Sequence, residues 1–219
     1  MRRAFKRWIA RTFNTWRAPA ARALQDWSRD GGEALRMRFP GLGPADTVLD
    51  FGGFEGAWAA RLHDAHGCRV HVFEPHPAFI ERLRHRFAGN AAVMVHPFAV
   101  GRADGVLPLS DDGDASSALS GKGAAVKGEI RAAARVFADL PEDRFAVAKI
   151  NIEGGEYDLL PALIEAGILD RIDRLQVQFH LYTRADLDRR ARLVAAIERT
   201  HASDWSYPFV WEQWSRRDA

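Results

Sequence analysis

The sequence predicts a doubly wound α/β fold, in which a mostly parallel sheet carries helices on both faces. Between residues 47 and 200, short apolar runs alternate with segments of helical spacing. Such alternation is typical of βαβ units, whose strands are buried on both faces of the sheet. A glycine-rich turn joins the first apolar run to the first helical segment, and α/β folds bind ligands at such turns. These observations together predict the fold class and the place of its site.

Length and composition indicate one globular domain with an N-terminal extension. The chain has 219 residues, of which 47% are hydrophobic and 27% charged, so a wholly disordered or fibrous protein is excluded. We expect a basic, amphipathic, helical extension over residues 1–40 and the α/β domain over residues 41–219. Cys68 is the only cysteine, which excludes a disulfide framework and cysteine-based zinc sites, and no metal is expected. The single thiol, and the lack of an apolar run suited to a signal peptide or membrane span, predict a cytoplasmic protein.

Basic residues are concentrated at the N-terminus. Residues 1–17 contain six Lys or Arg and no acid, whereas the rest of the chain has 25 basic and 29 acidic residues. That acidic balance argues against a nucleic-acid-binding core. Phe5, Trp8, Ile9, Phe13 and Trp16 have the spacing of one helical face, with most basic side chains opposite. Such a helix suits peripheral contact with the inner face of a membrane, or packing on its own domain or on a partner subunit.

The elements of the domain follow one another in a regular order. A helix is expected over residues 20–38, and the Pro- and Gly-rich segment at residues 39–44 separates it from the domain. Strands are expected at residues 47–51, 69–73, 92–99, 145–152 and 175–180. Helices are expected at residues 57–66, 78–88, 157–166 and 185–200.

Two segments interrupt this order. Residues 101–135 are rich in Gly, Ala, Ser and Asp, and we expect a short strand at 106–109 followed by a loop at 111–123. Loops of this length in compact domains are usually functional or disordered. Residues 205–214 are rich in aromatic residues, and we expect one strand there at the edge of the sheet.

The turn after the first strand has the features of a ligand site. Gly52 and Gly53 allow the backbone to approach a ligand, and Gly56 allows tight contact between helix and strand. The helix that follows offers free N–H groups to an anionic group. Phe54 stands where the dinucleotide fingerprint has its second glycine. Asp50 is expected to place a carboxylate beside the pocket, which favours a cationic ligand over a pyrophosphate.

An acidic residue ends the second strand. Glu74 follows Gly56 by 18 residues, a position suited to accepting hydrogen bonds from both hydroxyls of a ribose. A nucleoside with a positive centre and an amino-acid tail meets these requirements. The sequence therefore predicts S-adenosylmethionine as the cofactor.

Four motifs resemble the FkbM family of S-adenosylmethionine-dependent methyltransferases, from about residue 47 to at least residue 180. Asp50, Gly52 and Gly56 match the first motif, Asp-x-Gly-x-Asn-x-Gly, in which Phe54 replaces the asparagine. Glu74 and Pro75 match a Glu-Pro pair, and Ser116 and Ser117 match a serine pair in the long loop. Residues 149–156, KINIEGGE, match Lys-Ile-Asp-x-Glu-Gly-x-Glu, with Asn151 in place of the aspartate.

The resemblance implies the Rossmann-like sheet of class I methyltransferases and methyl transfer to a hydroxyl of a sugar, glycolipid, cell-surface polysaccharide or natural product. It places Pro75, Ser116, Ser117 and Asn151 with the cofactor, beside the residues of the glycine turn and Glu74. We expect the two serines to order the loop over the cofactor, although simple turn serines would have the same sequence pattern.

Deprotonation of the acceptor hydroxyl calls for a base near the ends of the strands. Asn151 cannot serve as one, which leaves Glu153 and His180 as the candidate catalytic residues. His180 has a suitable unperturbed pKa of about 6.5. Glu153 could instead bind the acceptor or cap the helix that begins near Gly155. Lys149 shares a sheet face with Asn151, and either the pocket or an acid could be its partner.

Two other functions fit parts of the pattern. A nicotinamide-dependent oxidoreductase shares the strand, the glycine turn and the acid, but the missing fingerprint glycine and Asp50 argue against it. A non-catalytic cofactor-binding module in glycan assembly would account for the departures at Phe54 and Asn151. The acceptor and the oligomeric state are not specified by the sequence.

Overall fold

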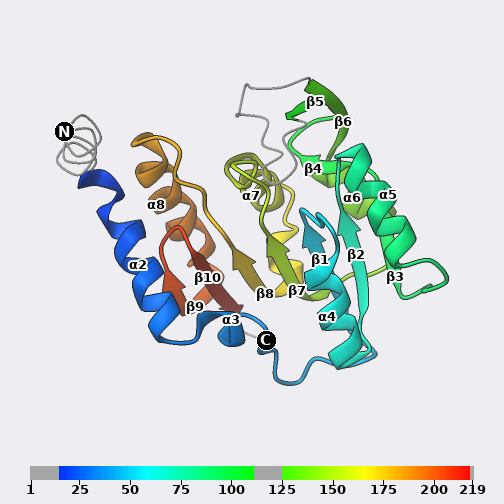
Figure 1. The fold of residues 1–219 in the computed structure, drawn as a ribbon, viewed down its shortest axis with the longest axis horizontal. Helices are drawn as coiled ribbons and strands as arrows, with labels where there is room; N and C mark the ends of the chain where they lie inside the picture. Colours follow the sequence, from blue (N-terminus) through cyan, green and yellow to red (C-terminus); the bar gives the residue numbers. More distant parts are fainter. Residues whose placement is uncertain (1–14, 111–124, 218–219) are drawn as a thin grey trace, which may run out of the picture.

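The fold is known from a computed structural model, which describes residues 15–110 and 125–217. Its centre is a seven-stranded sheet with the order β3-β2-β1-β7-β8-β10-β9 (Figure 1). Strands β3, β2, β1, β7 and β8 are parallel, β10 is antiparallel to β8, and β9 is antiparallel to β10. The bounds are β1 Thr47–Phe51, β2 Arg69–Phe73, β3 Val93–His96, β7 Phe145–Ile150, β8 Ile172–Val177, β9 His201–Tyr207 and β10 Trp211–Arg216.

The chain winds outward from the centre of the sheet in both directions. It runs from β1 through β2 to β3 on one side, and from β7 to β8 on the other. The carboxyl ends of β1 and β7 are therefore the switch point, where doubly wound sheets form a crevice. A short helix at Leu169–Arg171 (η2) lies in the connection from β7 to β8, and another at Thr15–Arg17 (η1) begins the described part of the chain.

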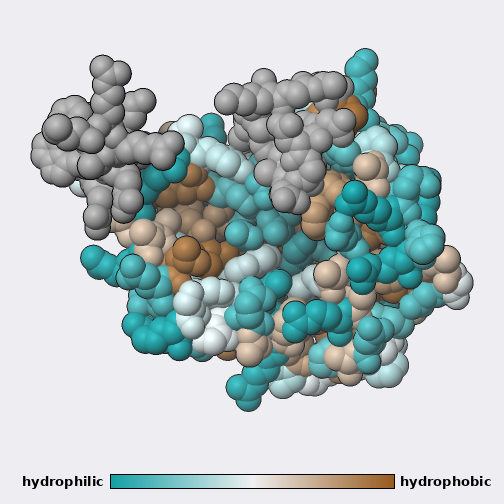
Figure 2. Space-filling view, in the orientation of Figure 1, coloured by the Kyte–Doolittle hydropathy of each residue, from teal (hydrophilic) through white to brown (hydrophobic). Residues whose placement is uncertain are grey.

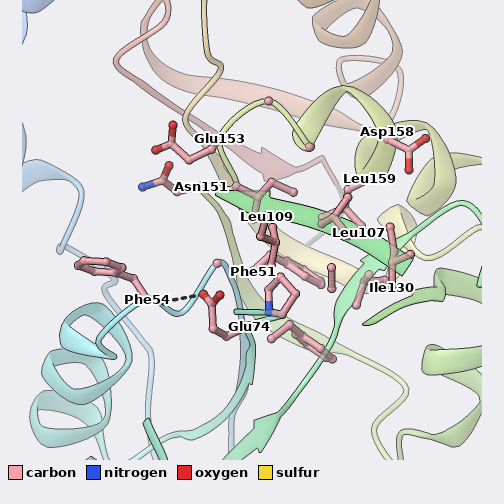
Figure 3. A pocket seen from close by; sticks show the side chains of 18 of the residues that line it. Phe51, Phe54, Glu74, Leu107, Leu109, Ile130, Asn151, Glu153, Asp158 and Leu159 are labelled. Carbon is pink, nitrogen blue, oxygen red and sulfur yellow. Dashed lines mark hydrogen bonds between the residues drawn. The ribbon is translucent and has the colours of Figure 1, made fainter. Parts of the chain in front are cut away.

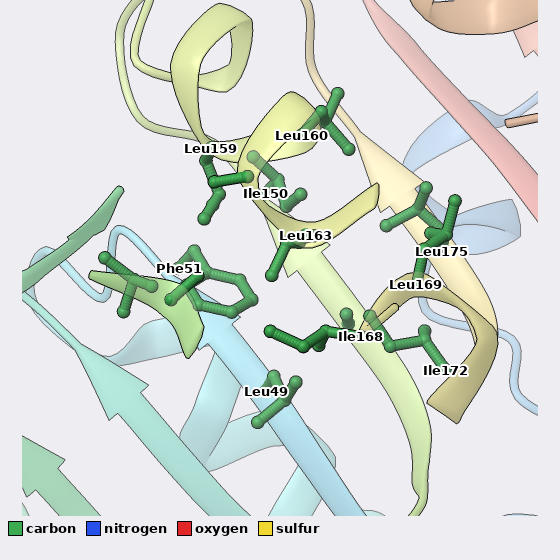
Figure 4. Close-up of a cluster of buried hydrophobic side chains, with 14 of the residues drawn as sticks. Leu49, Phe51, Ile150, Leu159, Leu160, Leu163, Ile168, Leu169, Ile172 and Leu175 are labelled. Atoms are coloured by element: carbon green, nitrogen blue, oxygen red, sulfur yellow. The ribbon is translucent and has the colours of Figure 1, made fainter. Parts of the chain in front are cut away.

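Helices cover the two faces of the sheet, as the sequence predicts. Their bounds are α2 Ala18–Arg29, α3 Gly32–Leu35, α4 Ala57–His66, α5 Pro77–Arg86, α6 Ala133–Asp139, α7 Glu156–Glu165 and α8 Ala185–Ile197. Side chains alternate between faces along each strand. Val48 and Val72 accordingly pack with α4 and α5, and Leu49 and Phe51 pack with α6 and α7 (Figure 4).

A second, three-stranded sheet stands above the carboxyl end of the first. Its order is β4-β6-β5, with bounds β4 Ala99–Gly101, β5 Gly105–Ser110 and β6 Ala125–Ala132. The expected strand at 92–99 is therefore two strands, β3 and β4, which belong to different sheets. The expected strand at 106–109 is confirmed as part of β5, whereas β6 and α6 were not predicted. The residues of the expected loop at 111–123 lie outside the described ranges.

The N-terminal helices pack on the edge of the sheet. The expected helix over residues 20–38 is broken, because Gly31 adopts a left-handed conformation (φ 69°) between α2 and α3. Trp27 of α2 is 6% exposed and packs against Trp205 and Tyr207 of β9. Figure 2 shows mostly hydrophilic side chains over this view of the molecule, with hydrophobic ones gathered between α2 and α8. Residues 1–14 of the basic segment lie outside the described ranges.

Two further expectations are corrected at the C-terminal side. The expected strand over residues 205–214 is a hairpin, in which the turn at Pro208 separates β9 from β10. The expected strand over residues 175–180 is β8, which begins and ends three residues earlier. His180 therefore lies in the segment beyond the sheet and before α8. No helix in residues 15–110 or 125–217 is long and apolar enough to cross a bilayer.

Candidate active site

A cavity of about 450 Å³ opens at the carboxyl ends of β1, β2 and β7, at the switch point of the sheet (Figure 3). This volume lies within the range of about 300–1,000 Å³ that is usual for small-molecule sites. The small sheet forms one apolar wall, with Leu107, Leu109 and Ile130. Phe54, Glu74, Asn151 and Glu153 lie on the opposite side in the close-up view.

The ionisable groups of the lining are all acidic. Among the described residues that line the cavity, Glu74, Glu153 and Asp158 carry carboxylates, and none is Lys, Arg or His. The other polar side chain of the lining is that of Asn151. A lining of this charge attracts a cationic ligand and repels a pyrophosphate.

Gly52 fits the tight approach between β1 and β7. It has a left-handed backbone (φ 82°), and a Cβ atom there would lie 2.0 Å from the carbonyl oxygen of Asn151. Its N–H group donates to the carbonyl oxygen of Phe73 (3.0 Å), which ties the turn to β2. Only glycine suits this position, because both the conformation and the space exclude a side chain.

Asp50 does not line the cavity, contrary to the expectation from the sequence. Its side chain faces away from the cavity, since Phe51, the next residue along the strand, lines it. Asp50 is fully buried and accepts a hydrogen bond from Lys149 Nζ (2.8 Å). Burial raises the pKa of Asp50, and the nearby Lys149 opposes that shift. Of the two partners considered for Lys149, the acid is therefore the one observed.

Gly53 and Gly56 lie beneath the turn and also outside the cavity lining. A Cβ atom on Gly53 would lie 2.2 Å from Val72, and one on Gly56 would lie 2.8 Å from Leu83. These two glycines therefore allow the turn to pack on β2 and α5. They support the site but do not line it.

Phe54 lines the cavity in an unusual conformation. It is one of three described non-glycine residues with positive φ (49°), and its ring meets Phe79 edge-on at 4.4 Å. Asparagine tolerates the left-handed region much better than phenylalanine does. The backbone at residue 54 therefore suits the asparagine of the motif that the sequence resembles, and Phe54 adopts this conformation at some cost in strain.

Glu74 is fixed by the backbone around it. Its two carboxylate oxygens accept hydrogen bonds from the N–H groups of Phe54 and His76, both at 2.9 Å. Burial raises the pKa of Glu74, and these two hydrogen bonds oppose the shift. Each oxygen keeps a further lone pair, so the carboxylate can still accept hydroxyl groups from a ligand in the cavity. Pro75 lines the cavity beside it.

Asn151 and Glu153 follow β7 at the mouth of the cavity. The Oδ1 atom of Asn151 is buried without a hydrogen-bond partner among the described residues. Glu153 has a left-handed backbone (φ 51°) and accepts a hydrogen bond from the hydroxyl group of Tyr182 (2.7 Å). Glu153 does not cap the following helix; Glu156 accepts the Gly154 N–H there instead (2.9 Å). Strained residues of this kind cluster at ligand sites.

His180 lies directly behind Glu153 and does not line the cavity. Its Nε2 atom is 3.4 Å from Glu153, and its Nδ1 atom is 3.1 Å from Glu156. Burial works against the charged ring, but hydrogen bonds to both carboxylates outweigh burial and raise the pKa of His180 to about 9. The unperturbed value expected from the sequence is thus replaced by one that keeps the ring charged at neutral pH.

Two predicted serines fall in the expected long loop, and two unpredicted residues, Glu156 and Tyr182, lie beside Glu153 and His180. Ser116 and Ser117 lie outside the described ranges. Glu156 and Tyr182 were not predicted as site residues. The sequence held a signal for Glu156, which is an acidic residue three positions after Glu153. In the described part of the chain, no three His, Cys, Asp or Glu side chains are grouped to hold a metal.

Comparison with known proteins places this site in a family. Residues 50–213, about three quarters of the chain, match the family described as Methyltransferase FkbM domain. The chain belongs to the FkbM methyltransferase family. No protein of curated function matches its sequence. The resemblance predicted from four motifs is thereby confirmed, and the oxidoreductase alternative is not supported.

Several solved structures share the fold of this FkbM protein. The N-methyltransferase NodS from Bradyrhizobium japonicum WM9 has a TM-score of 0.51 and 9% identity, over 87% of this chain and 97% of that chain. A protein described as an rRNA methylase from Clostridium thermocellum has a TM-score of 0.52 and 10% identity, over 80% of this chain and 88% of that chain. The fibrillarin/Nop5p complex has a TM-score of 0.53 and 11% identity, over 84% of this chain and 78% of that chain. Identities this low show the fold alone, a class I Rossmann-like methyltransferase fold as predicted.

The lining of this FkbM site fits S-adenosylmethionine. Glu74 has lone pairs for the ribose hydroxyls, the acidic lining suits a sulfonium, and the unpartnered Oδ1 atom of Asn151 can accept a hydrogen bond from the amino group of the methionine tail. The apolar wall of Leu107, Leu109 and Ile130 can cover the adenine ring. The residues present are therefore compatible with the cofactor of the family.

Proposed function

We propose that this protein transfers a methyl group from S-adenosylmethionine to a hydroxyl group of a sugar, glycolipid, cell-surface polysaccharide or natural product. The observation that carries the proposal is the lining of the cavity, with three carboxylates and no basic side chain among its described residues. When bound, the cofactor supplies an electrophilic methyl group on a sulfonium. Glu74, Pro75, Gly52 and Asn151 would hold it, with Gly53 and Gly56 supporting the turn.

Glu153 and His180 would serve the acceptor side. Glu153 lines the cavity next to Asn151, and its side chain is 35% exposed, which makes it accessible to an acceptor. The protein's contribution is to align the acceptor oxygen with the methyl group, to exclude water and to receive the proton of the hydroxyl. Tyr182 fixes Glu153 through its hydroxyl group and would also border the acceptor.

A glycan or small-molecule acceptor is favoured over a nucleic acid. Glu153 and Asp158 would repel a phosphate backbone at the cavity, and the chain outside residues 1–17 has more acidic than basic residues. A nucleic-acid acceptor is the second candidate, since one protein of the same fold is described as an rRNA methylase. Incubation with total RNA and with bacterial polysaccharide, using a radiolabelled methyl group, separates the two.

Residues 1–17 would bring the enzyme to the inner face of a membrane. The described chain starts at the same end of the molecule as the carboxyl ends of the parallel strands (Figure 1). Arg17 donates to the carbonyl oxygen of Tyr182 (3.4 Å), so this start lies next to the proposed acceptor side. Sedimentation with vesicles of anionic or neutral lipid tests this part; equal binding to both, or none, would contradict it.

Calorimetry tests the cofactor first. The full chain is titrated with S-adenosylmethionine and S-adenosylhomocysteine, and with NAD and NADP as controls. Binding of the first pair alone supports the proposal. Binding of a nicotinamide cofactor would overturn it, and cofactor binding without turnover on any acceptor would favour the non-catalytic module.

A further inference from the structure

Both ring nitrogens of His180 face carboxylates, which limits what this ring can do. Nδ1 lies 3.1 Å from Glu156 and Nε2 lies 3.4 Å from Glu153. A neutral imidazole has one donor nitrogen and can satisfy only one of these acceptors, whereas an imidazolium donates to both. The ring therefore has no nitrogen left to accept a proton from an acceptor molecule.

Glu156 is built into the protein to hold this arrangement. Its side chain is fully buried, and its Oε1 atom accepts the backbone N–H of His180 (2.7 Å) as well as the Nδ1 contact. Its Oε2 atom accepts the N–H of Gly154 (2.9 Å), at the start of α7. The position of the carboxylate is thus fixed by two backbone groups, one from each of the segments that it joins.

We infer that Glu156 is a positioning residue that holds His180 as an imidazolium against Glu153, and that Glu153 takes the proton of the acceptor hydroxyl. This inference rests on the proposed function. The acceptor O–H bond breaks with its proton moving to a Glu153 oxygen, the O–CH₃ bond forms, and the S–CH₃ electron pair stays on sulfur. Glu153 suits this role because it lines the cavity, whereas His180 does not.

The surrounding charges are compatible with a charged ring. Tyr157 of α7 donates its hydroxyl group to the carbonyl oxygen of His180 (2.8 Å). The other charged groups that the described residues place on this segment contact the neighbours of His180: Asp186 of α8 accepts the N–H group of Tyr182, Arg17 of η1 donates to the carbonyl oxygen of Tyr182, and Arg189 and Arg190 of α8 lie over the rings of Tyr157 and Phe179. The ring of Tyr182 stacks on the ring of His180 at 5.7 Å with an angle of 11°. The electron-rich face of Tyr182 further favours the imidazolium.

Nuclear magnetic resonance of the full chain, labelled with ¹⁵N-histidine, tests the inference without any acceptor. The signals of His180 are identified by their loss in His180→Gln. In the wild type we expect both nitrogens to be protonated at pH 7.5 and to titrate near pH 9. Titration of His180 near its unperturbed value, or a neutral ring at pH 7.5, would overturn the inference.

Variants separate positioning from a merely structural role. In Glu156→Gln, the loss of an adjacent charge should lower the pKa of His180 by about 1–3 units. Glu165→Gln, at the exposed end of the same helix, should leave it unchanged. An unchanged His180 titration in Glu156→Gln would contradict the inference. Should Glu156→Gln fail to fold, the wild-type titration still decides.

Binding of S-adenosylhomocysteine to the same samples is measured by calorimetry. Failure to bind, with a His180 that titrates near pH 9, would defeat the proposed function and leave the arrangement of charges intact. Binding with a neutral His180 would support the proposed function and defeat the inference.

Discussion

Lys149 Nζ lies 2.8 Å from Asp50 Oδ1 and 2.7 Å from the carbonyl oxygen of Gly52, in the buried space between β1 and β7. Both strands end at the cavity, so this one ammonium group joins the strand that carries the glycine turn to the strand that carries Asn151. Asp50, whose carboxylate the sequence places beside the ligand, acts instead as the counter-ion that keeps Lys149 in position. The pair therefore fixes the glycine turn from the side that faces away from the cavity.

Removal of one partner should destabilise the protein strongly. Asp50→Asn or Lys149→Met leaves the other charge buried and unpaired, for which we expect a loss of about 3–5 kcal/mol in the free energy of unfolding. The double variant Asp50→Asn/Lys149→Met should recover much of this loss. Urea unfolding of the three variants measures it. A double variant as unstable as the sum of the single ones would show that the two side chains are not coupled.

Gly52→Ala should unfold the turn or displace it. The added Cβ atom would meet the carbonyl oxygen of Asn151 at 2.0 Å, and the left-handed backbone alone costs an alanine about 1–2 kcal/mol. Gly43→Ala is the matched control, because a Cβ atom there has no atom within 4 Å. Thermal unfolding should show a clear fall in Tm for Gly52→Ala only. Equal Tm values for the two variants would refute the close approach of β1 and β7.

Glu74→Ala should weaken cofactor binding strongly, and it should also loosen the glycine turn, because the N–H groups of Phe54 and His76 lose their acceptor. Loss of a charged acceptor for two hydroxyls removes about 1.5–3 kcal/mol per hydrogen bond, or about 3–6 kcal/mol for both, which predicts at least a hundredfold weaker affinity for S-adenosylhomocysteine. Glu81→Ala, on the exposed surface of α5, is the control. Calorimetry measures both affinities, and circular dichroism checks the fold. A wild-type affinity in Glu74→Ala would remove this residue from the cofactor site.

The sequence predicted the elements around the glycine turn to the residue, because their signals are local. The apolar run of β1, the glycines after it and the helical spacing of α4 all lie within twenty residues, and the structure gives the same bounds. The helix boundary is marked by Gly56 and Gly67, which both adopt positive φ. Local propensity and tertiary packing agree in this part of the chain.

The sequence did not predict the elements and side-chain contacts that depend on residues far apart along the chain. The strand β6, with the sequence AVKGEIRA, mixes charged and apolar residues without strict alternation, and its Gly128 matters only because a Cβ atom there would meet Pro75 at 2.8 Å. Glu156 looks like an ordinary acid at the start of a helix, and only the fold brings it to His180, 24 residues later. The sequence therefore predicted the glycine turn better than the surroundings of Glu153 and His180, where the contacting residues come from separate segments.

Stability should fall as the pH rises from about 6.5 to 9. The pKa of His180 is raised to about 9 in the folded protein, above the ordinary histidine value of 6.5, so its charged form stabilises the folded state. This contribution is complete below pH 6.5 and is lost as the pH rises through 9, with a size of about 3 kcal/mol at most. Urea unfolding between pH 6 and 8.5, compared with His180→Gln, measures it. If the free energy of unfolding of His180→Gln fell with pH as steeply as that of the wild type, His180 would not be the cause.

The pH profile of methyl transfer should distinguish the two candidate bases. Were His180 the base, the rate would rise with pH until its ring loses the proton, near pH 9. With Glu153 as the base and His180 as its charged partner, the rate is level through neutral pH and falls above 9. The hydrogen bond from His180 lowers the pKa of Glu153, which extends the level region further to the acid side. The measurement is kcat/KM on the first acceptor that a glycan screen identifies.

Since Glu153→Gln keeps the size of the side chain and loses the basic oxygen, it should reduce kcat by about 10²–10⁴ with little change in cofactor affinity.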